Sequence, residues 1–295
     1  MKKVTRFLGL LFVILFLGGI ALLFIGGTMA NWPEMKFRDG KIIIGDGITI
    51  NGDVLGKVED ALEKNAIFHI GDNDMFTDGE KVWQGDVPKT KVTTDSVKDW
   101  NLELGGCEFV IMSTEEDAYY VEYKGEGKSQ AYTKGDELFV KVLDSSNISF
   151  DDENCFTLYV PKNAELDKVE IEVGIGKAIV DKFTAKEAEL SVGAGELFLE
   201  DAKLQKVKVE VGAGRCGIGG EITDELKAEC AMGSLELIVK GKEEDFDYKI
   251  EAVSGSVSLG GQQYSGLAKE KEIDNDAGKK MELECAMGNI QVKFE

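Results

Sequence analysis

The first five residues of ECAMGSLELIV, residues 229–239, recur in ECAMGNIQVKF, residues 284–294. In both copies a Glu-Cys-Ala-Met-Gly step precedes a segment in which apolar and polar residues alternate. Such alternation is typical of a β-strand, because successive side chains of a strand point to opposite faces. A structural unit that stacks on copies of itself explains this repetition more simply than a catalytic motif does. The repeat therefore predicts architecture before it predicts chemistry.

The same unit can be followed upstream by its glycine. The glycines that end successive Gly-Xaa-Gly, Met-Gly or Ser-Gly steps are separated by 19, 19, 19, 22 and 33 residues. A period near 20 residues that tolerates insertions is typical of stacked-repeat proteins. These marker glycines are Gly176, Gly195, Gly214, Gly233, Gly255 and Gly288.

Apolar side chains keep phase with the marker glycines. The third and fifth residues before each marker are apolar, as are the second and fourth residues after it, so we expect them to point into a common core. The third residues before the markers are Val173, Val192, Val211, Cys230, Ala252 and Cys285.

These patterns predict an all-β chain folded as a parallel β-solenoid with about 19–22 residues per coil. We call one coil a rung: a strand, a glycine corner, a second strand and a polar turn. Glycine at the corner would let the backbone bend or adopt a positive φ without a Cβ clash. Cys230 and Cys285 would then occupy the same inward position in two rungs.

An uncharged apolar run, FLGLLFVILFLGGIALLFI, covers residues 7–25. About 20 such residues suffice for a helix to cross a bilayer. Lys2, Lys3 and Arg6 precede the run, and Trp32 follows it, which predicts a cytoplasmic amino terminus. A cleaved signal peptide is the alternative, but its apolar region usually has 7 to 15 residues. We therefore expect one N-terminal transmembrane helix.

Three segments follow from this pattern. Residues 1–30 are the predicted cytoplasmic tail and membrane anchor, and residues 31–95 are a spacer or irregular subdomain without a clear period. Residues 96–295 form the predicted solenoid. This arrangement predicts a single-pass cell-membrane protein with most of its chain outside the cytoplasm.

The net charge of −21 argues against nucleic acid as a partner, because phosphate binding depends on clustered Lys and Arg. Acidic surfaces attract cations and basic partners instead. The five cysteines, Cys107, Cys155, Cys216, Cys230 and Cys285, are odd in number and lack paired spacing, so they do not predict a disulfide framework. Cys216, Cys230 and Cys285 stand at apolar positions of the rungs, so we expect them to be buried and unreactive, whereas Cys107 and Cys155 are less constrained by this argument.

Few residues suggest catalysis or metal binding. His69 is the single histidine and is read as an ordinary strand residue. Asp72, Asp74 and Asp78 resemble a calcium loop, but Phe76 stands where an oxygen ligand is needed. Asp274 and Asp276 are read as a solvated turn. The glycine steps lack the Lys-Ser/Thr and the helix of a phosphate loop. No catalytic, cofactor or metal residue is therefore predicted.

An outward column of carboxylates is the strongest candidate surface. Like charges stacked on neighbouring rungs repel one another, although Lys208, Lys227 and Lys249 two residues earlier could offset part of the charge. A mixed, solvated face is the simple interpretation, and a weak binding face for cations or a cationic polymer is the sharper hypothesis. The column comprises Glu172, Glu210, Glu229, Glu251 and Glu284.

The chain resembles a known family in several segments. These are LELGGCEFVI, FTLYVPKNAELDKVEIEVGIGKAIV, the VGAG repeats and the closing EIDNDAGKKMELECAMGNIQVKF. Over residues 96–295 they are similar to bacterial, membrane-anchored proteins of the "putative adhesin" class, a β-strand-repeat domain family of unknown function. The resemblance implies a β-solenoid outside the membrane and supplies no catalytic residues.

Three functions from different classes fit this sequence. The first is a non-enzymatic binding or structural module at the bacterial envelope, whose partner is wall polymer, a host surface or another membrane protein. The second is an envelope-stress sensor or regulatory accessory that binds a membrane protein. The third, a carbohydrate-active enzyme, is disfavoured because the sequence shows no distinctive carboxylate pair of the kind that glycosidases use.

Overall fold

The structure is a computed structural model that describes residues 80–143, 155–265 and 269–295, together with the backbone of residues 35–38, 41–44 and 48–50. The chain divides into two compact units, Met1–His69 and Ile70–Glu295. In the first unit, three strands form an antiparallel sheet in the order β1–β2–β3. They are β1 (Met35–Arg38), β2 (Lys41–Ile44) and β3 (Ile48–Ile50).

In the part of the chain that the structure describes, no helical segment has the length and hydropathy of a membrane span. The predicted anchor at residues 7–25 lies outside the described residues, as do His69 and the Asp72, Asp74 and Asp78 loop. The anchor therefore stays a prediction.

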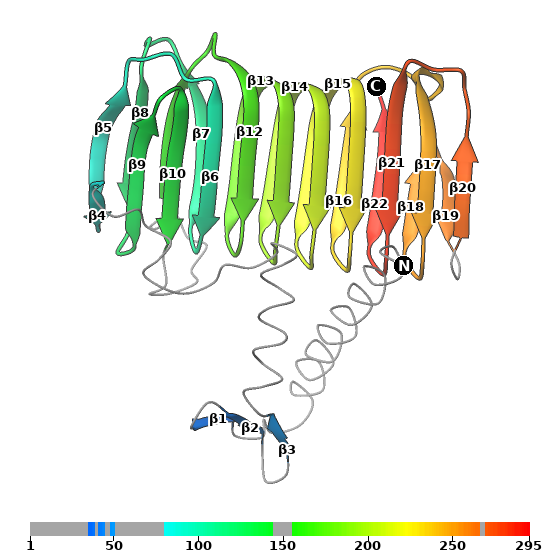
Figure 1. Ribbon diagram of the computed structural model, residues 1–295, viewed down its shortest axis with the longest axis horizontal. Helices are drawn as coiled ribbons and strands as arrows, with labels where there is room; N and C mark the ends of the chain where they lie inside the picture. Colours follow the sequence, from blue (N-terminus) through cyan, green and yellow to red (C-terminus); the bar gives the residue numbers. More distant parts are fainter. Residues whose placement is uncertain (1–34, 39–40, 45–47, 51–79, 144–154, 266–268) are drawn as a thin grey trace. The chain divides into compact units, whose positions relative to one another are not determined.

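The second unit is an all-β solenoid whose rungs stack side by side along one axis (Figure 1). Its strands are β4 (Val82–Gln84), β5 (Val87–Thr93), β6 (Asp99–Gly105), β7 (Glu108–Thr114), β8 (Tyr119–Lys124), β9 (Lys128–Lys134), β10 (Glu137–Leu143), β11 (Cys155–Pro161), β12 (Glu165–Val173), β13 (Lys177–Val192), β14 (Glu196–Val211), β15 (Arg215–Cys230), β16 (Ser234–Val239), β17 (Phe246–Ala252), β18 (Ser256–Leu259), β19 (Gln262–Ser265), β20 (Lys269–Ile273), β21 (Lys279–Cys285) and β22 (Asn289–Phe294), with a short 3₁₀ turn at Glu243–Asp245.

Each rung contributes one strand segment to each of two sheets. The segment before the glycine turn belongs to the first sheet, and the segment after the turn belongs to the second. The long strands β13, β14 and β15 bend between the two sheets, so that their first residues belong to the second sheet and their last residues to the first. The first sheet has the order β4–β9–β10–β6–β12–β13–β14–β15–β21–β17–β20. The second sheet has the order β5–β8–β11–β7–β13–β14–β15–β16–β22–β18–β19.

The prediction of a purely parallel solenoid is wrong at the ends of the stack, where the sheets are mixed. Consecutive coils pair in parallel from β12 to β16, as predicted. At one end β8 and β9 pair antiparallel with β11 and β10, and at the other end β19 and β20 pair antiparallel with β18 and β17. The reversal after β18 is a two-residue hairpin in which Gly260 and Gly261 both have positive φ. Glycine readily adopts this conformation, which the tight hairpin turn requires.

The rungs do not stack in sequence order. The last two strands, β21 and β22, lie inside the stack: β21 pairs with β15 on one side and β17 on the other, and β22 pairs with β16 and β18. The β6–β7 rung is likewise inserted between β10–β11 and the regular coils. The two ECAMG copies therefore lie on neighbouring rungs, with Cys230 opposite Cys285.

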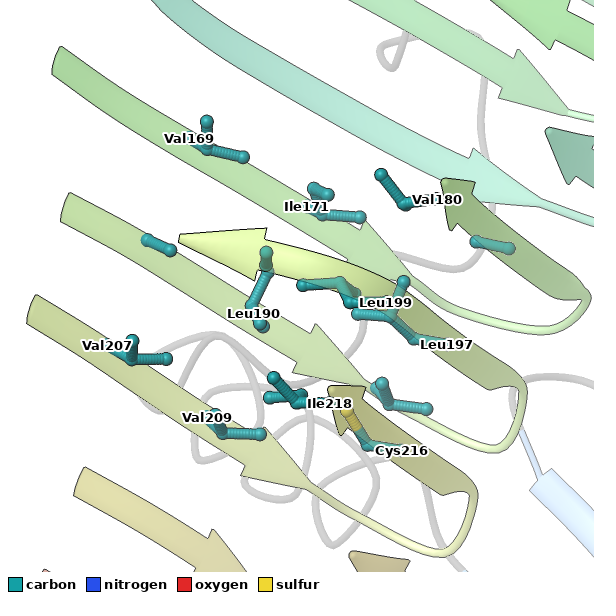
Figure 2. Close-up of a cluster of buried hydrophobic side chains, with 14 of the residues drawn as sticks. Val169, Ile171, Val180, Leu190, Leu197, Leu199, Val207, Val209, Cys216 and Ile218 are labelled. Carbon is teal, nitrogen blue, oxygen red and sulfur yellow. The ribbon is translucent and has the colours of Figure 1, made fainter. Parts of the chain in front are cut away.

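Inward side chains form continuous apolar columns between the two sheets. Figure 2 shows residues such as Ile171, Leu190 and Val209 directed from successive strands into one interior, and each is at most 2% exposed. Burial of such side chains is the main favourable contribution to folding. One column, in spatial order, is Val173, Val192, Val211, Cys230, Cys285 and Ala252.

The marker glycines stack directly on one another at the turns. Glycine is needed there because the backbone of the neighbouring rung lies close, rather than because the turn requires a positive φ. Of the six, Gly176 has a positive φ, at 137°, and the other five do not. A Cβ atom at Gly195 would lie 2.5 Å from the carbonyl oxygen of Gly176, and one at Gly288 would lie 2.4 Å from that of Gly233. The turns therefore need glycine because the neighbouring rung occupies the space of a side chain.

Candidate functional site

The predicted carboxylate column is brought together on the outer face of the first sheet. In spatial order it runs Glu103, Glu172, Ser191, Glu210, Glu229, Glu284, Glu251 and Glu270. Because of the inserted rung, Glu284 lies between Glu229 and Glu251. Four of the five predicted glutamates are therefore consecutive neighbours, and Ser191 separates Glu172 from them.

Lysines balance the ends of this four-residue run, although its centre keeps its charge. Lys208 contacts Glu210 at 2.5 Å, and Lys249 contacts Glu251 at 2.5 Å. Lys227 instead lies between Glu225 and Glu282, at 3.5 and 3.6 Å. The flanking rungs remove part of the water around the exposed Glu229 and Glu284, and neighbouring carboxylates repel them, so the pKa of both is raised.

This column yields a prediction about stability and pH. Since a raised carboxyl pKa means that the folded state binds the proton more tightly, the repulsion is fully present above the folded pKa and is relieved as the pH falls through it. We expect the E229Q/E284Q double variant to gain about 0.5–1 kcal/mol in the free energy of unfolding at pH 7 and low salt. The gain should shrink towards pH 4, as measured by urea denaturation. E200Q, at an exposed bend of β14, is the control, and an equal gain in it would contradict the prediction.

No metal centre emerges in the described part of the chain, where no group of three or more His, Cys, Asp or Glu side chains is arranged to hold an ion. Asp274 accepts a hydrogen bond from the backbone amide of Asp276 at 3.0 Å, within the connection between β20 and β21. Cation binding along the carboxylate column stays a prediction.

A second candidate surface lies on the outer face of the second sheet, near the β8–β9 end. Six apolar or aromatic side chains point outward there from five adjacent strands, and we call them the aromatic stripe. Strand pairing places these side chains next to one another from one strand to the next. Five strands at the usual spacing make the stripe about 19 Å long. The six residues are Tyr120, Tyr159, Met112, Val110, Ile179 and Phe198.

One lysine ties the two tyrosines of the stripe together. The Lys89 ammonium lies 4.7 Å from the ring centroid of Tyr120 and 4.6 Å from that of Tyr159, within the range of cation–π attraction. Lys89 also contacts Glu116 at 2.7 Å. The Tyr159 hydroxyl donates to Glu122 at 3.0 Å. The rings therefore have fixed positions while part of each remains exposed.

The electrostatics of this cluster follow from these contacts. The hydrogen bond from Lys89 lowers the pKa of Glu116. A hydrogen bond to Glu116 raises the pKa of Tyr120, whereas partial burial and then Glu122 raise the pKa of Tyr159. Both phenols therefore stay protonated as hydrogen-bond donors.

A shallow hollow of about 310 Å³ adjoins Tyr159. Carboxylate, ammonium, hydroxyl and thiol groups line it, which gives both donors and acceptors of hydrogen bonds. The lining residues are Glu108, Glu122, Lys124, Cys155, Thr157 and Tyr159.

At the far end of the stripe, Phe198 covers a glycine of the next rung. A Cβ at Gly217 would lie 2.8 Å from the Phe198 ring, so the ring occupies space that a side chain at Gly217 would need. The sequence carried a signal for this surface: Ile179 and Phe198 are apolar at positions that the alternation directs outward. The sequence analysis predicted a carboxylate surface and did not include these two residues.

Comparison with known proteins finds a family match over part of the chain. Residues 98–220 match the family model described as Toastrack DUF4097. A "putative cell adhesion protein" from Clostridium sporogenes shares 16% sequence identity, with a TM-score of 0.40, over 73% of this chain and 100% of that one. A "putative adhesin" from Bacteroides fragilis shares 13% identity, with a TM-score of 0.39, over 72% and 97%. No curated protein matches the sequence.

These TM-scores are low, so the assignment depends on the family match and the strand pairing. The matched segment includes the β6–β7 rung and the first regular coils, where parallel pairing is continuous. The resemblance to a β-strand-repeat family of unknown function is therefore confirmed at the level of a match: residues 98–220 match the Toastrack DUF4097 family model.

Proposed function

We propose that this chain is a non-catalytic binding module of the bacterial cell envelope, anchored by residues 7–25 and presenting its solenoid outside the membrane. The aromatic stripe is the binding surface in this proposal. Its support is the cluster in which Lys89 holds Tyr120 and Tyr159 side by side. Groups of exposed apolar side chains rimmed by polar ones are typical of interaction sites.

The chemistry of the stripe favours a linear, hydroxyl-rich polymer of the cell wall that is neutral or weakly cationic. Tyrosine offers an apolar ring and a polar hydroxyl, so it can contact both the carbon skeleton and the hydroxyl groups of a sugar. Glu108 and Lys124 in the adjoining hollow supply further acceptors and donors. The strongly negative chain disfavours polyanionic polymers.

The shape of the stripe also favours an extended ligand. Its side chains project from adjacent rungs of one sheet, so a polymer lying along the solenoid axis would meet a contact group at each rung. The strands fix these groups in place, which lowers the entropic cost of binding.

Binding to insoluble wall material tests this proposal. The full chain, in detergent micelles, is sedimented with purified bacterial cell-wall polysaccharide, and the bound fraction gives an affinity. We expect the Y120A/Y159A variant to bind at least about tenfold more weakly, since two central aromatic contacts are lost.

The chain offers a matched control on the other sheet. Tyr132 and Phe139 are stacked with centroids 5.0 Å apart on the outer face of the first sheet. The Y132A/F139A variant should bind like the unmodified chain. Equal losses in both variants would contradict the assignment to the stripe. Capture of one membrane protein without wall binding would favour the sensor or accessory function, and release of soluble sugar would favour an enzyme.

A further inference from the structure

Two buried thiols face each other between neighbouring rungs. Cys230 of β15 and Cys285 of β21 are partners in a parallel register, and each is 2% exposed. Both are free thiols. Neighbouring strands lie about 4.8 Å apart, which falls within the 4.4–6.8 Å range of Cα separations in disulfides.

The two sulfur atoms point the same way, towards the glycine turn of the next rung. A Cβ at Gly288 would lie 2.7 Å from Cys230 Sγ, and one at Gly255 would lie 2.5 Å from Cys285 Sγ. In sister rungs a Cγ1 atom of Val211 or Val192 occupies the equivalent place, beside Gly233 or Gly214. The thiols are therefore stacked side by side.

The other three cysteines have different surroundings. Cys216 is fully buried between Leu197 and Leu235, and burial raises the pKa of its thiol to about 12. Cys155 lies opposite Glu108 and Lys124. Cys107 is buried at the turn beside Gly176.

A buried thiol by itself is expected to be unreactive, but in this pair each thiol changes the pKa of the other. A hydrogen bond between the two side chains, together with burial, raises the pKa of Cys230, and the same hydrogen bond lowers the pKa of Cys285. A thiolate at Cys285 would thus be stabilised by the Cys230 thiol. The thiolate is the form that attacks a disulfide.

We propose that Cys230 and Cys285 form an oxidation site that closes a disulfide between β15 and β21 and thereby fixes the inserted C-terminal rung. The oxidant is a small disulfide. The Cys285 thiolate attacks one of its sulfurs and releases a thiolate, and Cys230 then displaces the second half. Two S–H bonds are lost and one S–S bond forms, while the oxidant gains two electrons and two protons and leaves as two thiols.

The position of this pair gives the disulfide a structural consequence. Hydrogen bonds to the strands on either side hold β21 and β22 within the stack. A covalent link from Cys230 to Cys285 would close a loop across the 55-residue interval between them and restrict the unfolded chain. Extracytoplasmic compartments are oxidising, so the predicted location would supply suitable oxidants.

Peptide mapping tests the proposal directly. The full chain in detergent micelles is incubated with glutathione disulfide below its melting temperature, denatured in acid, alkylated and digested without reductant. We expect one linked peptide pair, Cys230 with Cys285, while Cys107 and Cys216 are alkylated. The melting temperature should rise by roughly 5–10 °C and fall back after reduction.

Variants separate this pair from general thiol reactivity. C285A should abolish the link and the thermal shift, because it removes one of the two thiols. The variant should still fold, since alanine already occupies the equivalent position in the next rung, at Ala252. C216A should retain both, and glutathione attached to the half-exposed Cys155 would show that the oxidant was active. Full alkylation of Cys230 and Cys285 in the unmodified chain, even when oxidised near its melting temperature, would overturn the proposal. Links from Cys230 to other cysteines in similar yield would also overturn it.

Discussion

Replacing Gly214 with alanine should destabilise the solenoid by more than about 3 kcal/mol, enough to remove a large part of a typical domain's stability. The added Cβ would lie 2.1 Å from the carbonyl oxygen of Gly195 and 2.8 Å from a Val192 methyl group. Real Cβ contacts do not reach such distances, so the rungs would have to separate.

The turn cannot move without breaking hydrogen bonds on both sides. The Gly214 amide donates to Gly193 at 3.0 Å, and its carbonyl accepts from Ser234 at 3.0 Å. Arg215 donates to the Gly195 carbonyl at 2.9 Å, the same oxygen that the new methyl group would meet. Relief of the clash therefore costs ladder hydrogen bonds, each worth about 1 kcal/mol.

Thermal and urea denaturation of the G214A variant measure this effect. Gly278 is the matched control, since a Cβ there would have no atom within 4 Å and its φ lies outside the left-handed region. G278A should match the unmodified chain within about 0.5 kcal/mol, as expected for a surface substitution. A G214A variant as stable as G278A would show that the turns are not closely packed.

The local shape of a rung was predictable because its cause is local. Period-two alternation places Val209 and Val211 inward, whatever strand comes next. The contact between turns is different, because the space beside Gly214 is filled by Gly195 of another rung. Glycine at these turns could be predicted from the sequence. That the backbones of two neighbouring rungs approach each other there could be seen only in the structure.

The order of the rungs could not be predicted from the repeats. Equivalent inward residues fit equally well beside any neighbour, so periodicity does not decide whether Ala252 or Cys285 lies next to Cys230. The structure places Cys285 there. The 33-residue interval between Gly255 and Gly288, where a regular rung needs 19, was the largest irregularity in the spacing and marked the inserted strands.

The two candidate surfaces differed in how visible they were. Stacked glutamates are conspicuous because they repeat at one position of the period, and Glu210, Glu229 and Glu284 do lie in one column. The aromatic stripe combines residues from regular and irregular segments. Tyr120 and Tyr159 meet because β8 reverses direction and pairs antiparallel with β11, and no periodicity encodes that contact.

Removing residues 279–295 should disrupt the solenoid far more than the loss of a terminal rung would. These residues carry β21 and β22, which separate β15 and β16 from β17 and β18. Without them, β17 to β20 lose their parallel partners and keep the antiparallel pairs with one another. The point variant L283A, at a fully buried position, should itself cost about 2–5 kcal/mol.

Hydrogen exchange followed by mass spectrometry distinguishes an internal rung from a terminal one. Strands at a chain end or a sheet edge usually fray and exchange quickly, whereas internal strands open only when most of the domain unfolds. We therefore expect the amides of β21 and β22 to be protected like those of β14 and β15, and much better than those of β19 and β20. Rapid exchange in β21 would contradict the inserted position. Slow exchange would mean that β21 and β22 are held as an internal rung, between β15 and β16 on one side and β17 and β18 on the other.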